Sequence, residues 1–256
     1  MSSLLLYYSR ENRCSLNALA GALEMARLPG LDLSFPGTPG ELKAAAKAAG
    51  PGTAAAFSFF TAQRTQTARL VRDLRAAAGK DLYLLAGGPH PSAAPEETLA
   101  MGFDCVVTGE GEYAVIELLR ALAAGSPPPA GIIRGRPLTE LGEFPPFPAG
   151  AGLAGPIEIT RGCPFACTYC QTSYLFGGRP RHRPAGDILR HIDALLSRGL
   201  KEIRFITPDA FAYGSRDGRE IDLPALRGLL EPASELAEKK GGKIFFGSFP
   251  SEVRPE

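Results

Sequence analysis

Five short β-type runs alternate with five helical runs along residues 1–125, and this alternation limits the possible folds more than any other feature. The β-type runs are rich in branched or aromatic side chains, and the helical runs are rich in Ala and Leu. Consecutive β-α units predict a doubly wound parallel sheet with helices on both faces. The expected strands are 4–8, 31–35, 54–60, 82–86 and 104–108, and the expected helices are 15–27, 39–48, 65–78, 95–101 and 112–123.

Ligands of an open parallel sheet bind beyond the carboxyl ends of its strands, so the segments that follow the expected strands are candidate binding loops. They combine glycines, which let a ligand approach the backbone, with small polar side chains. These segments are SRENR from residue 9, SFFT from residue 58, GGPHP from residue 87 and GEGE from residue 109. The sequence predicts a crevice at this end of the sheet but does not identify its occupant.

A segment dense in Pro and Gly divides the chain. Residues 126–154 lack helical periodicity and predict a linker that runs over the surface. After it the alternation resumes, with expected strands at 157–160, 202–206 and 243–249 and expected helices at 185–198 and 223–239. We therefore expect one domain at 1–125 and a second at 155–256.

Charge and hydropathy exclude several classes of partner. The chain has 256 residues and a formal net charge of +1, without the basic excess of a nucleic-acid binder, so nucleic acid is not favoured. The apolar run at 4–8 is too short for a signal peptide or a membrane span, and no other stretch approaches roughly 18 uninterrupted apolar residues. We expect a cytoplasmic protein with no membrane partner and with reduced cysteines.

Three of the five cysteines lie close together in RGCPFACTYCQ, residues 161–171. Clustered thiols in a reducing compartment indicate metal or redox chemistry. A structural zinc site almost always has four protein ligands, and iron–sulfur clusters are usually held by four cysteines. Cys163, Cys167 and Cys170 supply three, and His182 is the nearest candidate for a fourth. A cluster with three protein ligands leaves one iron open to a small molecule; buried structural cysteines or a zinc knuckle are the alternative.

The residues around this C-x3-C-x2-C loop help to decide between an iron–sulfur cluster, a zinc knuckle and structural cysteines. A β-type run precedes it, Pro164 bends it, and Tyr169 stands directly before its last cysteine. In these features the sequence resembles the radical S-adenosylmethionine (SAM) superfamily. The resemblance implies that the three cysteines hold a [4Fe-4S] cluster whose open iron binds SAM, that Tyr169 packs near the adenine, and that residues 155–256 form the first units of a partial (β/α)6 barrel of the TIM type. It also implies that an electron cleaves SAM to a 5′-deoxyadenosyl radical, which requires an external donor such as flavodoxin or ferredoxin.

Further SAM contacts are expected at the ends of the next two strands. Residues 208–210 read PDA where the family usually has a glycine-rich stretch, and this resembles the aspartate-containing form of its cobalamin-dependent branch. The resemblance implies that Asp209 accepts hydrogen bonds from the SAM amino group; an aspartate that caps a helix or turn is the alternative. The last expected strand brings Ser248, Glu252 and Arg254 near the same rim, within reach of SAM or substrate.

The N-terminal half resembles the Rossmann-like cobalamin-binding domain that precedes a radical SAM core in a large subfamily. The resemblance rests on GGPHP, followed by PEETL and FDCVVTGEGE. The stretch GEGEYA at 109–114 matches a dinucleotide fingerprint, but it follows the fifth strand, and Glu110 and Glu112 would repel a pyrophosphate. We therefore reject dinucleotide binding.

The resemblance implies cobalamin contacts from the four crevice loops. The D-x-H-x-x-G motif, whose histidine ligates cobalt in some cobalamin enzymes, is absent, so we expect backbone and polar contacts without a protein imidazole on the metal. The alternative is a Rossmann-like scaffold that binds no corrinoid. The implied contacts are Ser9, Arg10, Asn12, Ser58, Phe59, Thr61, Gly87, Gly88, His90, Gly109, Glu110 and Gly111.

Other reactive or charged side chains have structural interpretations. Cys105 lies inside an apolar run and is expected to be buried, and Cys14 has no assigned role. His191 is expected on the surface of its helix. The basic run RPRHRP at 179–184 is interpreted as a solvated loop, with contact to an anionic substrate as the alternative.

Together these features predict a radical SAM enzyme that binds a [4Fe-4S] cluster, SAM and cobalamin and transfers a methyl group to an unactivated carbon of a small molecule or peptide. The alternatives are radical SAM rearrangement or cyclisation with a vestigial corrinoid domain, and a non-catalytic iron–sulfur or corrinoid-binding fragment. A six-unit barrel needs roughly 200 residues, and about 100 follow Gly155. We therefore expect either a fragment of a longer chain or a partner that completes the barrel.

Overall fold

The structure is a computed structural model that describes residues 2–48, 50 and 52–247. The chain divides into two compact units, Met1–Pro137 and Leu138–Glu256. The division falls inside the segment expected to be a linker. Among the described residues no helix combines the length and the apolar character needed to cross a membrane.

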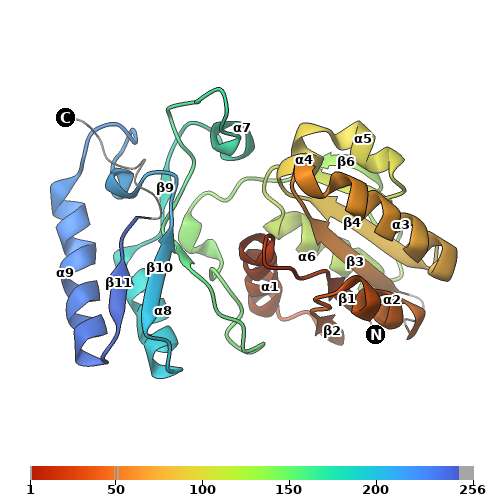
Figure 1. Cartoon of the computed structure of the whole chain (residues 1–256), viewed down its shortest axis with the longest axis horizontal. Coiled ribbons are helices and arrows are strands. Elements are labelled where there is room, and N and C mark those ends of the chain that lie inside the picture. The colour runs from red at the N-terminus through yellow and green to blue at the C-terminus, as the bar shows by residue number, and fades with distance from the viewer. Residues whose placement is uncertain (1, 49, 51, 248–256) are drawn as a thin grey trace. The chain divides into compact units, whose positions relative to one another are not determined.

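The N-terminal unit is built on a six-stranded sheet whose paired strands are all parallel, in the order β2-β1-β3-β4-β5-β6 (Figure 1). Its strands are β1 (Ser2–Leu6), β2 (Leu31–Ser34), β3 (Thr53–Ser58), β4 (Leu82–Gly87), β5 (Cys105–Thr108) and β6 (Gly131–Arg134). Its helices are α1 (Arg13–Ala26), α2 (Pro39–Ala48), the 3-10 turn η1 (Thr61–Gln63), α3 (Arg64–Ala78), α4 (Pro89–Ala93), α5 (Pro95–Ala100) and α6 (Glu112–Ala123).

Helices cover both faces of this sheet, which confirms the doubly wound fold. Leu5, Phe57 and Leu84 lie in one buried cluster with apolar side chains of α2 and α3. Because successive strand residues point to opposite faces, the buried Leu4 and Leu6 face the other layer, where α1 packs against α6. The chain leaves β1 for β2 and returns to β3 on the other side of β1, so the switch point of the sheet lies between β1 and β3.

Two elements of this unit differ from the sequence prediction. β6 pairs with β5 over residues 131–134, inside the segment interpreted as linker. Its four residues contain only two β-branched side chains, and they stand in a stretch rich in Pro and Gly, so the sequence pattern did not predict a strand. The GGPHP turn continues directly into α4, because Pro89 occupies the first helical turn, where a missing N–H costs nothing.

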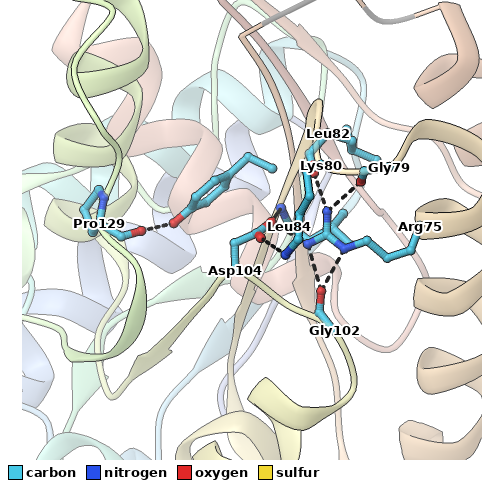
Figure 2. A network of polar contacts seen from close by, with 9 residues as sticks. Arg75, Gly79, Lys80, Leu82, Leu84, Gly102, Asp104 and Pro129 are labelled. Atoms are coloured by element: carbon cyan, nitrogen blue, oxygen red, sulfur yellow. Dashed lines mark hydrogen bonds and ion pairs between the residues drawn. The ribbon is translucent and has the colours of Figure 1, made fainter.

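A polar network fixes the amino end of the sheet, opposite the candidate crevice (Figure 2). Arg75, near the end of α3, donates hydrogen bonds to the carbonyl oxygens of Leu82 and Gly102 and to the carboxylate of Asp104. The other partners of Asp104 are the backbone N–H of Leu84, at 2.8 Å, and Lys80. Burial alone would raise the pKa of Asp104, but these hydrogen bonds outweigh it and hold the pKa below its usual value.

The C-terminal unit alternates strands and helices, as the first units of a β/α barrel do (Figure 1). A parallel sheet in the order β11-β10-β7 carries α8 and α9, and β8 pairs with β9 in an antiparallel ribbon. The elements are the 3-10 turn η2 (Leu141–Glu143), β7 (Ile157–Glu158), β8 (Thr160–Arg161), α7 (Thr172–Phe176), β9 (Arg181–His182), α8 (Ala185–Ser197), β10 (Glu202–Ile206), the 3-10 turn η3 (Ala210–Ala212), α9 (Leu223–Lys239) and β11 (Lys243–Phe245).

The first expected strand of this unit is divided in two. Ile157 and Glu158 pair with β10, whereas Thr160 and Arg161 pair with β9. The chain therefore leaves the barrel sheet just before the cysteine loop. The last expected strand, 243–249, is shorter in the structure, where β11 ends at Phe245. Ser248, Glu252 and Arg254 lie outside the described residues.

Candidate cluster and cofactor sites

The cysteine loop runs from β8 to α7, and contacts from its far end hold its first cysteine. Gly162 has φ of +93°, and a Cβ atom there would lie 2.4 Å from the carbonyl oxygen of Arg179, so only glycine fits. The N–H of Cys163 donates to the carbonyl oxygen of Gly177 at 3.1 Å. Its own carbonyl accepts a hydrogen bond from Ser173 Oγ at 2.6 Å. The position of Cys163 is thus fixed from both sides.

The three predicted ligands lie near one another. Cys163 is partly buried, whereas Cys167 and Cys170 are exposed. The N–H of Cys170 donates to the carbonyl oxygen of Cys167 at 2.9 Å, so these two share one turn. Burial raises the pKa of the Cys163 thiol, and the charges of Cys170, Cys167 and Asp209 act in the same direction, against a hydrogen bond from the backbone of Phe165. The three thiols therefore influence one another electrostatically.

His182, the nearest candidate for a fourth ligand, is occupied within the fold. Its Nδ1 lies 3.0 Å from Thr160 Oγ1, and its Nε2 lies 2.8 Å from the carbonyl oxygen of Ser215. The edge of the ring contacts Tyr213, with centroids 5.5 Å apart. Neither ring nitrogen is available to a metal.

Cysteine thiols are the side chains that usually hold iron–sulfur clusters. Throughout the part of the chain that the structure describes, no group of three or more His, Cys, Asp or Glu side chains is placed to hold a metal ion. The loop presents three thiols without a fourth protein ligand. These residues fit a [4Fe-4S] cluster with one iron open to a small molecule.

Two predicted SAM contacts lie beside the thiols. Asp209 follows β10, and its Oδ1 accepts a hydrogen bond from the N–H of Phe211 at 3.0 Å, so it caps the 3-10 turn η3 as the alternative interpretation foresaw. The charge of Asp209 also raises the pKa of Cys163. Tyr169 is 91% exposed and interacts with Cys167. Contact of either residue with SAM stays a prediction.

Arg219 belongs to the same surface, and the sequence interpretation missed it. Its guanidinium donates to the carbonyl oxygen of Pro164 at 3.2 Å and lies over the ring of Phe165, 5.4 Å from the centroid. It therefore contacts the cysteine loop from a segment more than fifty residues further along. An isolated arginine in a polar stretch gives no sequence signal for such a contact.

The basic run at 179–184 is not a solvated loop. It contains β9, and Arg183 is 2% exposed. The Arg183 guanidinium donates hydrogen bonds to the carbonyl oxygens of Glu158 and Phe144 and to the carboxylate of Asp187, at 2.6–3.0 Å. Full hydrogen bonding and a paired charge allow this cation to be buried.

His191 is not a surface residue either. It is partly buried, its Nε2 lies 3.4 Å from Asp187, and its ring edge contacts Phe147. Burial alone would raise the pKa of Asp187, but hydrogen bonds from His191 and Arg183 outweigh it and lower that pKa. The expectation for His191 failed because Phe147 comes from the segment interpreted as linker.

In the N-terminal unit, Asn12 joins two predicted loops at the switch point of the sheet. Its Nδ2 donates to the carbonyl oxygens of Tyr7, after β1, and of Ser58, at the end of β3, at 2.9 and 3.0 Å. Its Oδ1 accepts from the N–H of Ser9 at 2.8 Å. The oxygen and nitrogen of this buried amide both form hydrogen bonds within the fold, so Asn12 positions the two loops. Arg10, beside it, is exposed.

His90 joins the next two loops and is 3% exposed. Its backbone N–H donates to the carbonyl oxygen of Phe59, and its ring Nδ1 lies 3.1 Å from Thr61 Oγ1. Its ring packs against that of Phe59 with centroids 5.3 Å apart. Burial lowers the pKa of His90; Glu97 opposes this and Arg64 adds to it. Its Nε2 lies 4.0 Å from a carboxylate oxygen of Glu97, and the role of His90 toward a corrinoid stays a prediction.

The remaining loops are equally close-packed. Gly88 has φ of +91°, and a Cβ atom there would lie 2.4 Å from Ser58 Oγ. Gly109, after β5, donates its N–H to Ser92 Oγ at 3.0 Å, and Gly111 caps α6. The side chain of Glu110 is buried. Four predicted loops, including Gly87 at the end of β4, thus lie at the carboxyl edge of one sheet.

Backbone groups, glycines and small polar side chains form this edge, and the imidazole of His90 is turned into the fold. That donor set fits a corrinoid held through backbone and polar contacts without a protein ligand to cobalt. Direct contact of any of these residues with the corrinoid remains a prediction.

Two family models divide the chain between them. The model for the B12 binding domain matches residues 10–119, and the model for the Radical SAM superfamily matches residues 157–254. The chain is a B12-binding radical SAM protein. These two domain types imply a [4Fe-4S] cluster, SAM and cobalamin.

This B12-binding radical SAM protein is similar to curated proteins over part of their length. It is 28% identical over 153 residues to an uncharacterized methyltransferase of Synechocystis sp., covering 58% of this chain and 28% of that protein. It is 27% identical over 113 residues to a tRNA-2-methylthio-N(6)-dimethylallyladenosine synthase of Pelobacter propionicus, covering 44% of this chain and 24% of that protein.

A solved structure has a similar fold. The radical SAM methyltransferase TsrM from Kitasatospora setae, determined with tryptophan substrate and the SAM analog aza-SAM bound, aligns with a TM-score of 0.64 at 14% identity. The alignment covers 93% of this chain and 51% of TsrM. The chain thus spans about half the length of TsrM and between a fifth and a third of the two curated relatives.

Proposed function

We propose that this B12-binding radical SAM protein takes part in cobalamin-dependent methyl transfer to an unactivated carbon of a small molecule or peptide. The observation that carries the proposal is the combination, in one chain, of a loop with three cysteine thiols and a parallel sheet whose carboxyl edge carries glycine-containing loops joined by Asn12 and His90. When bound, the cluster supplies the electron that cleaves SAM, and the corrinoid carries the methyl group.

In this proposal the residues of the C-terminal unit bind and orient. Cys163, Cys167 and Cys170 hold the cluster as thiolates, and the contacts of Ser173 and Gly162 keep their loop in place. The carboxylate of Asp209, close enough to act on Cys163, accepts a hydrogen bond from the SAM ammonium group. Tyr169, exposed beside Cys167, covers the adenine.

In the N-terminal unit the edge loops hold the corrinoid. Asn12 and His90 fix the spacing of those loops, so the glycine-containing turns meet the ligand in a preformed arrangement. Support comes from the B12 binding domain match and from the methyltransferase relative.

A second candidate is radical SAM chemistry without a working corrinoid, such as rearrangement or cyclisation. The similarity to a tRNA synthase named for a methylthio product, rather than to a methyltransferase alone, supports this candidate. We also propose an external electron donor of the flavodoxin or ferredoxin type, because Cys167 and Cys170 are exposed.

Anaerobic reconstitution separates these candidates. We expect the chain to bind iron and sulfide with the broad visible absorbance of a [4Fe-4S] cluster and to retain hydroxocobalamin on gel filtration. Matched samples in which all three loop cysteines are replaced by Ser should lose the iron but keep the corrinoid. Iron without corrinoid would favour the second candidate, and neither cofactor on a folded chain would exclude both. Transfer of labelled methyl from SAM then tests the reaction itself.

A further inference from the structure

The residues that follow β6 have no role in the sites described so far. β6 pairs with β5 as far as Arg134, opposite Thr108. The N–H of Gly135 then donates to the carbonyl oxygen of Thr108 at 2.9 Å, which continues the pairing one residue further. These residues lie beyond the match to the B12 binding domain, which ends at 119.

Gly135 is packed against the middle of the β5–α6 turn. A Cβ atom at this position would lie 1.7 Å from the carbonyl oxygen of Glu110 and 2.7 Å from its carbonyl carbon. Both residues are buried. Because the obstacle is backbone, no side-chain rotation can relieve it, and any larger residue must displace the turn.

Arg136 continues the contact to the helix that follows the turn. Its guanidinium lies over the ring of Tyr113, 3.5 Å from the centroid, in the first turn of α6. On the other side of the same turn, Gly109 donates to Ser92 Oγ. The turn is therefore held between α4 on one side and residues 135–136 on the other.

We propose that Gly135 and Arg136 are positioning residues of the corrinoid site, because they fix the turn Gly109–Gly111 at the carboxyl edge of the sheet. The inference rests on the proposed function, since it assumes that this turn contacts the corrinoid. Its consequence is that residues 134–136 become protected when the corrinoid binds, because a ligand that holds the turn also holds the segment packed on it.

The test measures the affinity of the full chain for hydroxocobalamin by absorbance titration. Gly135→Ala should weaken binding by roughly tenfold or more, because the turn must shift to admit the methyl group. Gly40→Ala is the matched control: it lies in α2 of the same unit, and its added Cβ meets nothing nearer than 4.0 Å. This control should bind like the wild type.

A second pair of variants leaves the buried packing intact. Arg136 is exposed, so replacing it should not prevent folding. Arg136→Gln removes the cation from the Tyr113 ring and should weaken binding roughly two- to fivefold, whereas Arg136→Lys, which keeps a cation there, should recover most of the affinity. Trypsin cleavage after Arg134 should slow in the wild type when hydroxocobalamin is added.

The outcomes distinguish the inference from the function on which it rests. A wild type that binds no hydroxocobalamin overturns both the inference and the corrinoid part of the proposed function. A wild type that binds, beside folded Gly135→Ala and Arg136→Gln variants with unchanged affinity, overturns the inference alone. If Gly135→Ala does not fold, the Arg136→Gln and Arg136→Lys pair decides, and equal affinity in both overturns the inference.

Discussion

Nε2 of His182 lies 2.8 Å from the carbonyl oxygen of Ser215. A carbonyl oxygen only accepts, so Nε2 carries the proton and Nδ1 accepts from the hydroxyl of Thr160. Burial lowers the pKa of His182, which keeps the ring neutral near pH 7. The histidine closest in sequence to the cysteine loop is therefore bound to the fold through both nitrogens.

Iron content tests this assignment. Replacing His182 by Gln should leave the iron bound after anaerobic reconstitution unchanged, whereas Cys163→Ser, Cys167→Ser or Cys170→Ser should each lose most of it. Cys14→Ser is the matched control, because Cys14 lies in the other unit and outside the loop. A folded His182 variant without iron would show that the imidazole is a ligand after all.

Local patterns predicted most of the fold. The stripe Ile188, Ile192, Leu195 and Leu196 repeats at helical spacing, and α8 spans nearly the predicted residues. β6 was missed, because GIIR becomes a strand only through pairing with β5, whose sequence lies more than twenty residues earlier. Such pairing depends on tertiary context, which a short sequence window does not contain.

For the candidate sites, too, local features were predicted and tertiary contacts were not. The cysteine spacing is local, so the three thiols were predicted residue by residue, and the carboxyl-end rule located the edge loops. Which polar groups contact one another could not be predicted. Arg183 looked solvated because its partners, Glu158 and Phe144, are distant in sequence. Asn12 looked like a ligand contact, although its amide already binds Tyr7 and Ser58.

The Arg75–Asp104 contact predicts a large loss of stability in the N-terminal unit. The Asp104 side chain is 16% exposed and would lose its main cation in Arg75→Met. We expect the free energy of unfolding to fall by about 2–4 kcal/mol, since a partly buried carboxylate keeps only the exposed Lys80 as a cation and the carbonyl oxygens of Leu82 and Gly102 lose their donor. Chemical denaturation measures this loss. Arg72→Met, an exposed change in the same helix, should stay within about 0.5 kcal/mol of the wild type, and equal stability of the two variants would contradict the prediction.

His90 predicts that stability falls in mild acid. Its pKa is lowered in the folded state by burial and by Arg64, against the opposing charge of Glu97. Below the unfolded value of about 6.5 the unfolded chain binds more protons, so the free energy of unfolding declines as the pH falls. The decline from one histidine is at most about 1.4 kcal/mol per pH unit. Denaturation of His90→Asn between pH 7.5 and 5.5 (about the range in which histidine titrates) should give a flatter slope than the wild type, and parallel slopes would refute the assignment.

Asn12 offers the sharpest test of the switch-point edge, because Asn12→Asp keeps the shape and reverses the hydrogen bonding. The introduced carboxylate can still accept from Ser9 N–H, but it faces the carbonyl oxygens of Tyr7 and Ser58, to which the amide donated. We expect the free energy of unfolding to fall by about 2–4 kcal/mol near pH 7. The decrease should be smaller in acid, because the carboxyl becomes protonated and can donate again. Hydroxocobalamin binding should also weaken, because the two loops separate. Ser9→Ala, which removes only an exposed contact to Glu11, is the control. A loss of stability that does not change with pH would mean that the donors of Asn12 are not what joins β1 to β3.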